Sequence, residues 1–500
     1  MLTSDALICT DGGPLLLAPQ WLMRPEGMQR GWAVAVQGGR FTQVGPVDEV
    51  RAAHPGRAIV DLPQHLLMPG LIDTHTHLTQ SFGKALAFGE PSEIFKRIWV
   101  PMEGVLDTHA AYLSAKLAAW ESLRGGFTTV VDAGTRSEEG LAGVAQAARD
   151  TGIRCVLGLI CNDIGLPDND EGEAGRRRIL DRAAAFLRQF EHDPLVHPSL
   201  AISIPEAATD RMLHDVAALT REAGRRFQTH VNEHLAAVER SLVARGLRPI
   251  ELLHAVGALN ASALLAHATL LTHREFGLLQ DSGAAVAYNP VASAWKGNAV
   301  LDAGMLQLLG VPFGLGTDGT RADGLRLLDA AETTQRLTHG LANGDSSCGG
   351  GWTWLDHGTH RGAEAAGLGA LTGRIEAGFA ADFLLLDLDT PEFLPSWDLS
   401  WELVRYGNRD QIRAVFVNGA LRLWQGWPVD WDARALMREV AEVARRDVAR
   451  APLQRVHATA DAHRARHVNE RGSGHGGGHG AAVPNAQWPG APRTRHAPDA

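Results

Sequence analysis

The chain has 500 residues, of which 45% are hydrophobic and 21% charged, a globular composition that excludes disorder throughout. A formal net charge of -10 without clustered basic residues excludes a polyanion-binding surface, so we expect no nucleic-acid partner. No N-terminal signal pattern and no apolar run of about 18 residues occur, which predicts a cytoplasmic protein that neither crosses nor binds a membrane. Four scattered cysteines fit reduced thiols in that compartment: Cys9, Cys155, Cys161 and Cys348.

Residues 1–65 contain short apolar runs separated by turn signals. Runs at 6–9, 32–36 and 40–44 predict strands, and Gly38-Gly39 between the last two predicts a hairpin turn. We interpret this segment as the first part of a small β-sandwich domain.

From residue 66 the pattern changes to alternating strands and helices. Leu113, Leu117, Trp120 and Leu123 recur at helical spacing and predict the first long helix, which Gly125 ends. Eight apolar runs predict strands, one before His75 and the others at 129–132, 155–160, 200–204, 227–230, 264–267, 285–288 and 313–318. Because helical stretches separate them, the strands are expected to run parallel and to close into a (β/α)₈ TIM barrel over residues 66–370.

The C-terminal part returns to strand character. Residues 371–430 predict the second part of the β-sandwich. The expected fold class is therefore α/β, with a small domain built from N- and C-terminal segments of the chain. Residues 431–455 predict an amphipathic helix with Leu436, Val440 and Val443 facing inward. Residues 456–500 are rich in Gly, His, Arg and Pro and predict a disordered tail.

Polar residues fall where the predicted barrel strands end. His75 and His77 are one residue apart on a strand, so both side chains project from the same face. His230, His267 and Asp318 end the fifth, sixth and eighth strands. Each alone has an ordinary structural explanation, as a hydrogen-bonded core histidine or a turn residue. In a TIM barrel, however, all five would converge on the rim that carries catalysis.

Three imidazoles and one carboxylate with an open position are typical of a catalytic Zn²⁺ or Fe²⁺ site. Such an ion lowers the pKa of bound water to about 7. Glu233 follows His230 by three residues and is a candidate general acid/base, the alternative being a solvated loop carboxylate.

These motifs resemble those of the amidohydrolase superfamily. The resemblance rests on Pro69 to His77, His230-x-x-Glu233, Gly316-Thr317-Asp318 and Gly378 to Asp382. The nearest branch is the mononuclear guanine deaminase and triazine hydrolase (chlorohydrolase-like) group. The His-x-x-Glu pair and a fourth strand that ends at Ile202 to Pro205 without a metal-bridging lysine both favour it.

The resemblance implies a role for each candidate residue. His75, His77, His230 and Asp318 would bind one divalent ion, Zn²⁺ or Fe²⁺. His267 would orient the attacking water, Glu233 would protonate a ring nitrogen of the substrate, and Asp318 would accept the proton of the water. The expected reaction is release of ammonia from a small aminated nitrogen heterocycle, by attack of hydroxide generated at the metal.

Two segments depart from the pattern of the family. Asn289-Pro290 is followed by Val291 to Trp295 where the family has a Ser-Asn pair, and Arg321 lies in a second divergent segment. Both segments are expected at the rim. We name four candidate substrate contacts, of which Asn289, Trp295 and Arg321 lie in these two segments and Trp99 lies in the segment after the first barrel strand, which also resembles that of the branch.

Two other functions remain open at this stage. The same metal site could hydrolyse an amide, an imide or a C–Cl bond, or the chain could be an inactive scaffold protein that keeps the fold. The default assembly is a homodimer.

Overall fold

The computed structural model describes residues 3–8, 12–90, 93–137, 139–167, 169–456, 459–461 and 464. Residues 1–454 form one compact unit, and residues 455–500 belong to a second. Cys9 and nearly all of the predicted tail, residues 456–500, lie outside the described residues. Among the described residues, no helix combines the length and the apolarity needed to cross a membrane.

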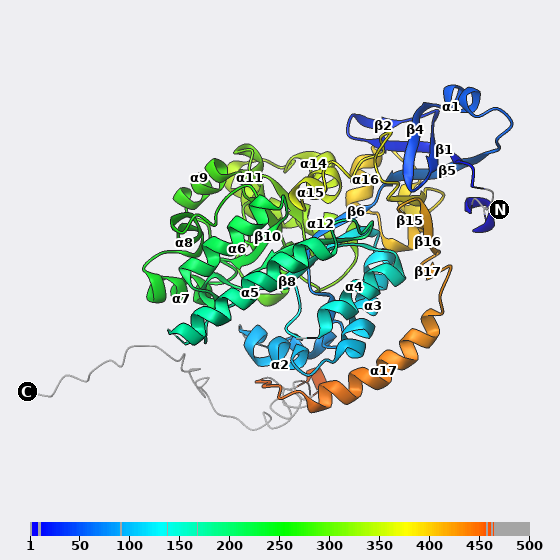
Figure 1. Ribbon diagram of the computed structural model, residues 1–500. Helices are drawn as coiled ribbons and strands as arrows, with labels where there is room; N and C mark the ends of the chain where they lie inside the picture. Colours follow the sequence, from blue (N-terminus) through cyan, green and yellow to red (C-terminus); the bar gives the residue numbers. More distant parts are fainter. Residues whose placement is uncertain are drawn as a thin grey trace, which may run out of the picture. The chain divides into compact units, whose positions relative to one another are not determined.

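The larger part of the first unit is a barrel of eight parallel strands (Figure 1). Each strand pairs with the next one along the chain: β6 (Leu71–Thr76), β7 (Phe127–Asp132), β8 (Arg154–Ile160), β9 (Val196–Ala201), β10 (Phe227–Val231), β11 (Ala263–His267), β12 (Ala285–Tyr288) and β13 (Phe313–Leu315). Nearly every residue of these strands is buried, because helices cover the outer face of the barrel. The predicted TIM barrel is confirmed. Two predicted strands extended too far, since β9 ends at Ala201 and β13 at Leu315.

Helices follow the strands in the expected alternation. They are α2 (Val100–Glu103), α3 (Thr108–Arg124), α4 (Gly140–Thr151), α5 (Asp170–Gln189), α6 (Asp210–Glu222), α7 (Leu235–Arg245), α8 (Pro249–Ala255), α9 (His273–Ser282), α10 (Pro290–Lys296), α11 (Ala303–Leu308), α12 (Gly324–Gln335), α13 (Leu341–Asn343), α14 (Gly350–Gly358) and α15 (His360–Ala365). The first long helix, α3, has the N-cap Asp107 and ends at Gly125, where the sequence predicted its end.

Asp73 joins the two edge strands of the barrel, β6 and β13. Its carboxylate accepts hydrogen bonds from the backbone N–H of Thr317 at 2.9 Å and from the Thr317 hydroxyl at 2.5 Å. One residue further on, the N–H of Asp318 donates to the carbonyl of His75 at 2.8 Å. Burial raises the pKa of Asp73 to about 7, although the hydrogen bonds from Thr317 and His75 oppose the rise. These bonds bring the first and eighth strands side by side.

The small β domain is one nine-stranded sheet that joins the two ends of the chain. Its strands are β1 (Leu15–Arg24), β2 (Gly27–Gln29), β3 (Trp32–Gln37), β4 (Arg40–Pro46), β5 (Ile59–Pro69), β14 (Phe383–Asp387), β15 (Ile412–Val417), β16 (Ala420–Trp424) and β17 (Trp427–Pro428). Strand β14 pairs antiparallel with β5, so the C-terminal segment completes the N-terminal layer. Helix α1 (Val47–Ala53) belongs to this N-terminal part, and α16 (Leu399–Arg405) lies between β14 and β15 in sequence.

One prediction for the N-terminal segment was wrong, and two strands were missed. Asp5–Leu7 is a 3-10 turn where a strand was predicted from residue 6, and β1 and β5 were not predicted. Each of these strands contains a proline, Pro19 or Pro63, and their burial patterns do not alternate regularly. The predicted C-terminal helix is present as α17 (Ala433–Arg450), with Leu436, Val440 and Val443 buried.

A buried ion pair connects the barrel to the small domain. Arg154, at the start of β8, donates from Nε and Nη2 to the two carboxylate oxygens of Asp382, at 2.9 and 3.1 Å. Asp382 also accepts hydrogen bonds from the hydroxyl of Thr372 and the N–H of Asn418. Both charged side chains are almost completely buried, so neither has water as a substitute partner.

We therefore expect Asp382→Ala to destabilise the chain by about 3–5 kcal/mol, because it leaves a buried guanidinium without its counter-ion. Thermal or urea unfolding followed by circular dichroism measures the loss. The control is Asp48→Asn, which removes an exposed partner of Arg51 and should cost about 1 kcal/mol or less. Equal stability of the Asp382 and Asp48 variants would contradict this assignment.

Candidate active site

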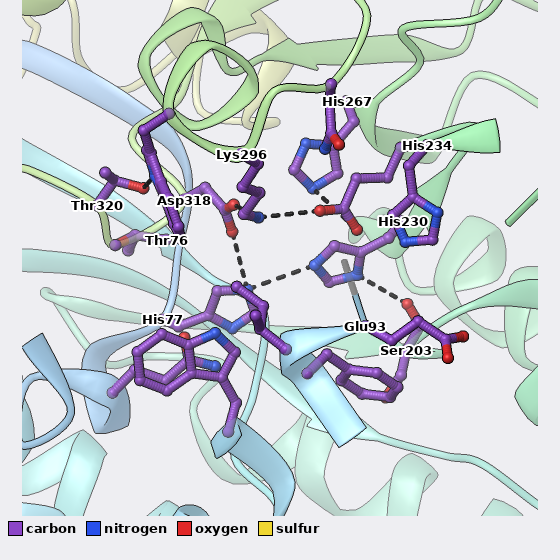
Figure 2. A pocket seen from close by; sticks show the side chains of 18 of the residues that line it. Thr76, His77, Glu93, Ser203, His230, His234, His267, Lys296, Asp318 and Thr320 are labelled. Atoms are coloured by element: carbon purple, nitrogen blue, oxygen red, sulfur yellow. Dashed lines mark hydrogen bonds and ion pairs between the residues drawn. The ribbon is translucent and has the colours of Figure 1, made fainter. Parts of the chain in front are cut away.

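The structure brings the polar strand ends together at one rim of the barrel (Figure 2). His75 lies on β6 and His77 directly follows it, and each Nε2 lies 3.3 Å from Asp318 Oδ1, just past β13. His230, near the end of β10, has its Nε2 3.4 Å from the Nε2 of His77. One ligand atom from each of the four residues lies within 4.8 Å of all the others. Strands far apart in sequence therefore supply one compact cluster.

The donor atoms of this cluster fit a divalent metal ion. Although Asp318 Oδ1 lies 3.3 Å away, the buried Nε2 of His75 makes no hydrogen bond of normal geometry among the described residues. The Nε2 atoms of His77 and His230 face each other, although neutral imidazole nitrogens in lone-pair contact repel unless a proton or a cation lies between them. A cation held by these three imidazoles and the Asp318 carboxylate would satisfy all four side chains at once. Three imidazoles and one carboxylate form a set that Zn²⁺ and Fe²⁺ both accept.

Neighbouring groups hold the histidines in the orientation that ligation requires. The Nδ1 of His230 lies 2.7 Å from the carbonyl of Ser203, so Nδ1 carries the proton and Nε2 is left for a ligand. Burial lowers the pKa of His75 to about 4 and that of His230 well below its ordinary value. Both rings are therefore uncharged at neutral pH, which is the form that binds a metal.

The backbone is strained at the residues that carry the site. The φ angles of His267 and Asp318 are 74° and 55°, and that of Asn232 is 50°, all in the left-handed region. Such a conformation costs about 1–3 kcal/mol for a non-glycine residue and is concentrated at functional sites. Gly316 is required nearby, because a Cβ there would lie 2.2 Å from Asn289 Oδ1. The strained backbone therefore lowers the stability of the fold at these residues, but it directs their side chains into the site.

Glu233 and Asp318 are joined by a lysine that the sequence interpretation missed. Lys296, the last residue of α10, donates to Glu233 Oε1 at 2.9 Å and also to Asp318 Oδ2. Burial alone would lower the pKa of Lys296, but the two carboxylates raise it above its usual range. Burial alone would raise the pKa of Glu233, but the charge of Lys296 holds it below its usual range. All three groups are therefore ionised at neutral pH.

A second group of potential ligands adjoins the first. It consists of Glu233, His267 and Asp318, so the two groups share Asp318. The Nε2 of His267 lies 4.0 Å from Glu233 Oε2, and its Nδ1 lies 3.2 Å from the amide nitrogen of Asn289. Burial lowers the pKa of His267, so this ring is also uncharged at neutral pH.

These residues open into a cavity of about 420 Å³, within the range of ~300–1,000 Å³ for small-molecule sites. Trp99 and Trp295 line it, and the indole N–H of Trp295 donates to the Thr320 hydroxyl at 2.8 Å. The other two candidate substrate contacts lie elsewhere. Asn289 is buried behind His267, and Arg321 is 48% exposed, pairs with Asp323 and does not line the cavity.

Some site residues carried only a weak sequence signal. Lys296 directly follows Trp295, in the divergent segment after the seventh strand, but a lone lysine near a helix end is usually solvated. Asp73 lies within the first motif, yet only the folded barrel shows that its partner is Thr317. Arg136 lines the cavity from the loop after β7, where no motif marks it.

Comparisons with known proteins agree with this geometry. A model of a bacterial imidazolonepropionase-like composite domain matches residues 33–56. A 5-methylthioadenosine/S-adenosylhomocysteine deaminase of Nitratidesulfovibrio vulgaris is 28% identical over 414 residues, covering 83% of this chain and 92% of the relative. A zinc-bound crystal structure of an adenosine deaminase from Xanthomonas campestris matches with a TM-score of 0.78 and 26% identity, covering 87% of this chain and 98% of that one. A zinc complex of an atrazine chlorohydrolase from Arthrobacter aurescens has a TM-score of 0.75, covering 86% of this chain and 100% of that one, but at 21% identity it shows the fold alone. The amidohydrolase family model matches residues 66–422, most of the chain, and the chain therefore belongs to the amidohydrolase family.

Proposed function

We propose that this chain is a metal-dependent aminohydrolase that releases ammonia from an aminated heterocycle of the adenine-nucleoside type. The observation that carries the proposal is the convergence of four potential metal ligands beside Glu233, His267 and Lys296 in one cavity. The similarity to adenine-nucleoside deaminases, one with bound zinc, supports the substrate class and the metal.

In this proposal His75, His77, His230 and Asp318 hold the ion. A divalent ion in such a site acts as a Lewis acid and lowers the pKa of bound water to about 7. Zinc is the ion that we propose, although the same ligands would accept Fe²⁺.

The proton transfers belong to residues of the chain. In the overall reaction, water oxygen bonds to the carbon that bears the amine, the C–N bond breaks, and ammonia leaves. Glu233, which lines the cavity and is ionised beside Lys296, takes up one proton of the attacking water and passes it to the adjacent ring nitrogen, which lets that carbon accept the oxygen. Asp318 accepts the other proton of the water and delivers it to the departing amine. His267 donates a hydrogen bond that orients the water.

We further propose that each chain binds one ion. The second potential ligand group contains Glu233 and Asp318, and the ammonium of Lys296 already lies against both carboxylates. Two buried carboxylates need compensating positive charge. Lys296 supplies that charge on the side of the second group, so a second divalent ion would lie against a buried cation.

Glu233→Gln should lower kcat/KM for ammonia release by about 10²- to 10⁴-fold, because the amide does not transfer the proton. The metal content should stay unchanged, since Glu233 is outside the four-ligand set. The control is Glu239→Gln, an exposed residue of the following helix, α7, which should retain full activity. An unchanged kcat/KM in the Glu233 variant would exclude it as the proton donor.

Removal of the metal should abolish activity. Dialysis against a chelator, followed by titration with Zn²⁺, should restore ammonia release with an endpoint at one ion per chain, measured by plasma mass spectrometry. His230→Ala should lose the metal and should not be restored by added zinc. Full activity of metal-free protein, or an endpoint at two ions, would contradict the proposal.

The position of Lys296 gives a separate test of metal stoichiometry. Lys296→Met leaves two carboxylates without their shared cation, so this variant should bind a second zinc ion at zinc concentrations where the wild type binds one. Isothermal titration calorimetry with metal-free protein compares the two. A single binding event in both proteins would show that Lys296 does not exclude the second ion.

The homodimer, the cytoplasmic location and the domain boundaries at residues 65, 370, 430 and 455 stay predictions. Light scattering measures the assembly.

Amide, imide and chloro-heterocycle substrates belong in the same screen as the amino-heterocycles, because exclusive turnover of one of these would overturn the deaminase assignment.

A further inference from the structure

Arg136 and Glu103 form an ion pair at the wall of the cavity. Nη1 of Arg136 donates to Glu103 Oε2 at 2.8 Å, and the guanidinium carbon lies 5.0 Å from the centre of the Phe95 ring. Arg136 follows β7 by four residues, and Glu103 ends α2. An arginine fixed by a carboxylate on one side and an aromatic ring on another has little freedom to move.

The two partners differ in their access to the cavity. The Glu103 side chain is fully buried, its other oxygen accepts from the Thr79 hydroxyl at 2.8 Å, and it does not line the cavity. The Arg136 side chain is 15% exposed and does line the cavity. The arginine is therefore the member of the pair that a ligand reaches.

Arg136 keeps hydrogen-bonding capacity for that ligand. A guanidinium has five N–H donors, and within the described part of the chain only two of them have acceptors, Glu103 and, at 3.4 Å, the hydroxyl of Ser203. Ser203 is also the residue whose carbonyl accepts from Nδ1 of His230. Ser203 therefore contacts both Arg136 and the proposed metal ligand His230, and the remaining donors of Arg136 lie close to that ligand.

The charge of the cavity disfavours an anionic ligand. Six carboxylates and four cationic side chains line it, so one divalent ion would bring this lining to formal neutrality. Glu103 cancels the charge of Arg136 from behind. A carboxylate on the substrate would accept hydrogen bonds from Arg136, but no net positive charge would compensate for the loss of its hydration. An uncharged oxygen would accept the same hydrogen bonds and would not pay that desolvation penalty.

We propose that Arg136 is a specificity-determining residue, which donates hydrogen bonds to an uncharged oxygen on the substituent of the heterocycle, such as a sugar hydroxyl. The Glu103 carboxylate is the positioning group that holds the guanidinium in place. This inference rests on the proposed function and narrows its substrates to neutral nucleosides, in preference to free bases and to derivatives with a carboxylate.

Binding without turnover tests this inference separately from the proposed function. In the zinc-loaded Glu233→Gln protein, calorimetry measures the Kd of adenosine and of 9-methyladenine, which has the same ring but no hydroxyls. Arg136→Met should weaken adenosine by about 10- to 100-fold, the range for hydrogen bonds from a charged donor, and should leave 9-methyladenine within about threefold. Adenosine 5′-carboxylate should bind the parent protein more weakly than adenosine does.

Two further variants separate recognition from folding. Arg136→Met/Glu103→Gln avoids a buried carboxylate without a partner and should show the same loss for adenosine alone. Arg149→Met is the matched control, since Arg149 pairs with Asp193 at 2.7 Å and lies 5.4 Å from the Phe190 ring, but does not line the cavity. It should change neither Kd.

The results distinguish the two proposals. Absence of ammonia release by the wild-type protein would defeat the proposed function and would leave the binding measurements to decide the role of Arg136. Equal weakening of both ligands, no weakening of adenosine, or no binding of adenosine to the parent protein would overturn the role assigned to Arg136.

Discussion

Closure of the barrel between its first and eighth strands is the constraint on which the site depends. His75 lies on β6 and His77 directly follows it, whereas Asp318 follows β13 and is 243 residues away from His75 in the chain. The Asp73 carboxylate, bound to Thr317, and the backbone bond from Asp318 to His75 hold these segments in contact. Without this closure the Asp318 carboxylate and the imidazoles of His75 and His77 would lie at opposite edges of an open sheet. The interaction that completes the fold is thus also the one that assembles the proposed metal ligands.

Charge balance explains the composition of the site. Neutral imidazoles supply most of the proposed ligands, so the negative charge comes from Asp318 and Glu233, both held ionised beside Lys296. Lys296 and one divalent ion together would carry more positive charge than the two carboxylates carry negative charge. Further acidic side chains that line the cavity offset this excess positive charge. The two carboxylate oxygens of Asp318 have different partners. Oδ1 faces the potential metal ligands His75 and His77, whereas Oδ2 faces Lys296.

The cavity has chemically distinct parts. The potential metal ligands, Glu233 and His267 lie at one end of the cavity, where the proposed reaction would break a C–N bond. Trp99 and Trp295 provide aromatic surface for a flat ring. Arg136 and its buried partner Glu103 offer fixed donors to an attached group. A heterocycle with a polar, uncharged substituent matches all three features, which agrees with the nucleoside class of substrate that we propose.

The sequence by itself determined the barrel, its approximate strand positions and the residue types of the proposed metal set, because buried parallel strands appear as apolar runs and their polar ends meet at one rim. It did not reveal β1 and β5, whose prolines and irregular burial hide their pairing, or the places of Asn289 and Arg321 away from the cavity. Only the tertiary structure decided that Lys296 joins Glu233 to Asp318 and that Glu103 holds Arg136. Those pairs connect residues 22 to 63 positions apart that leave no periodic pattern, since an ion pair depends on where two side chains meet in space and not on their spacing along the chain.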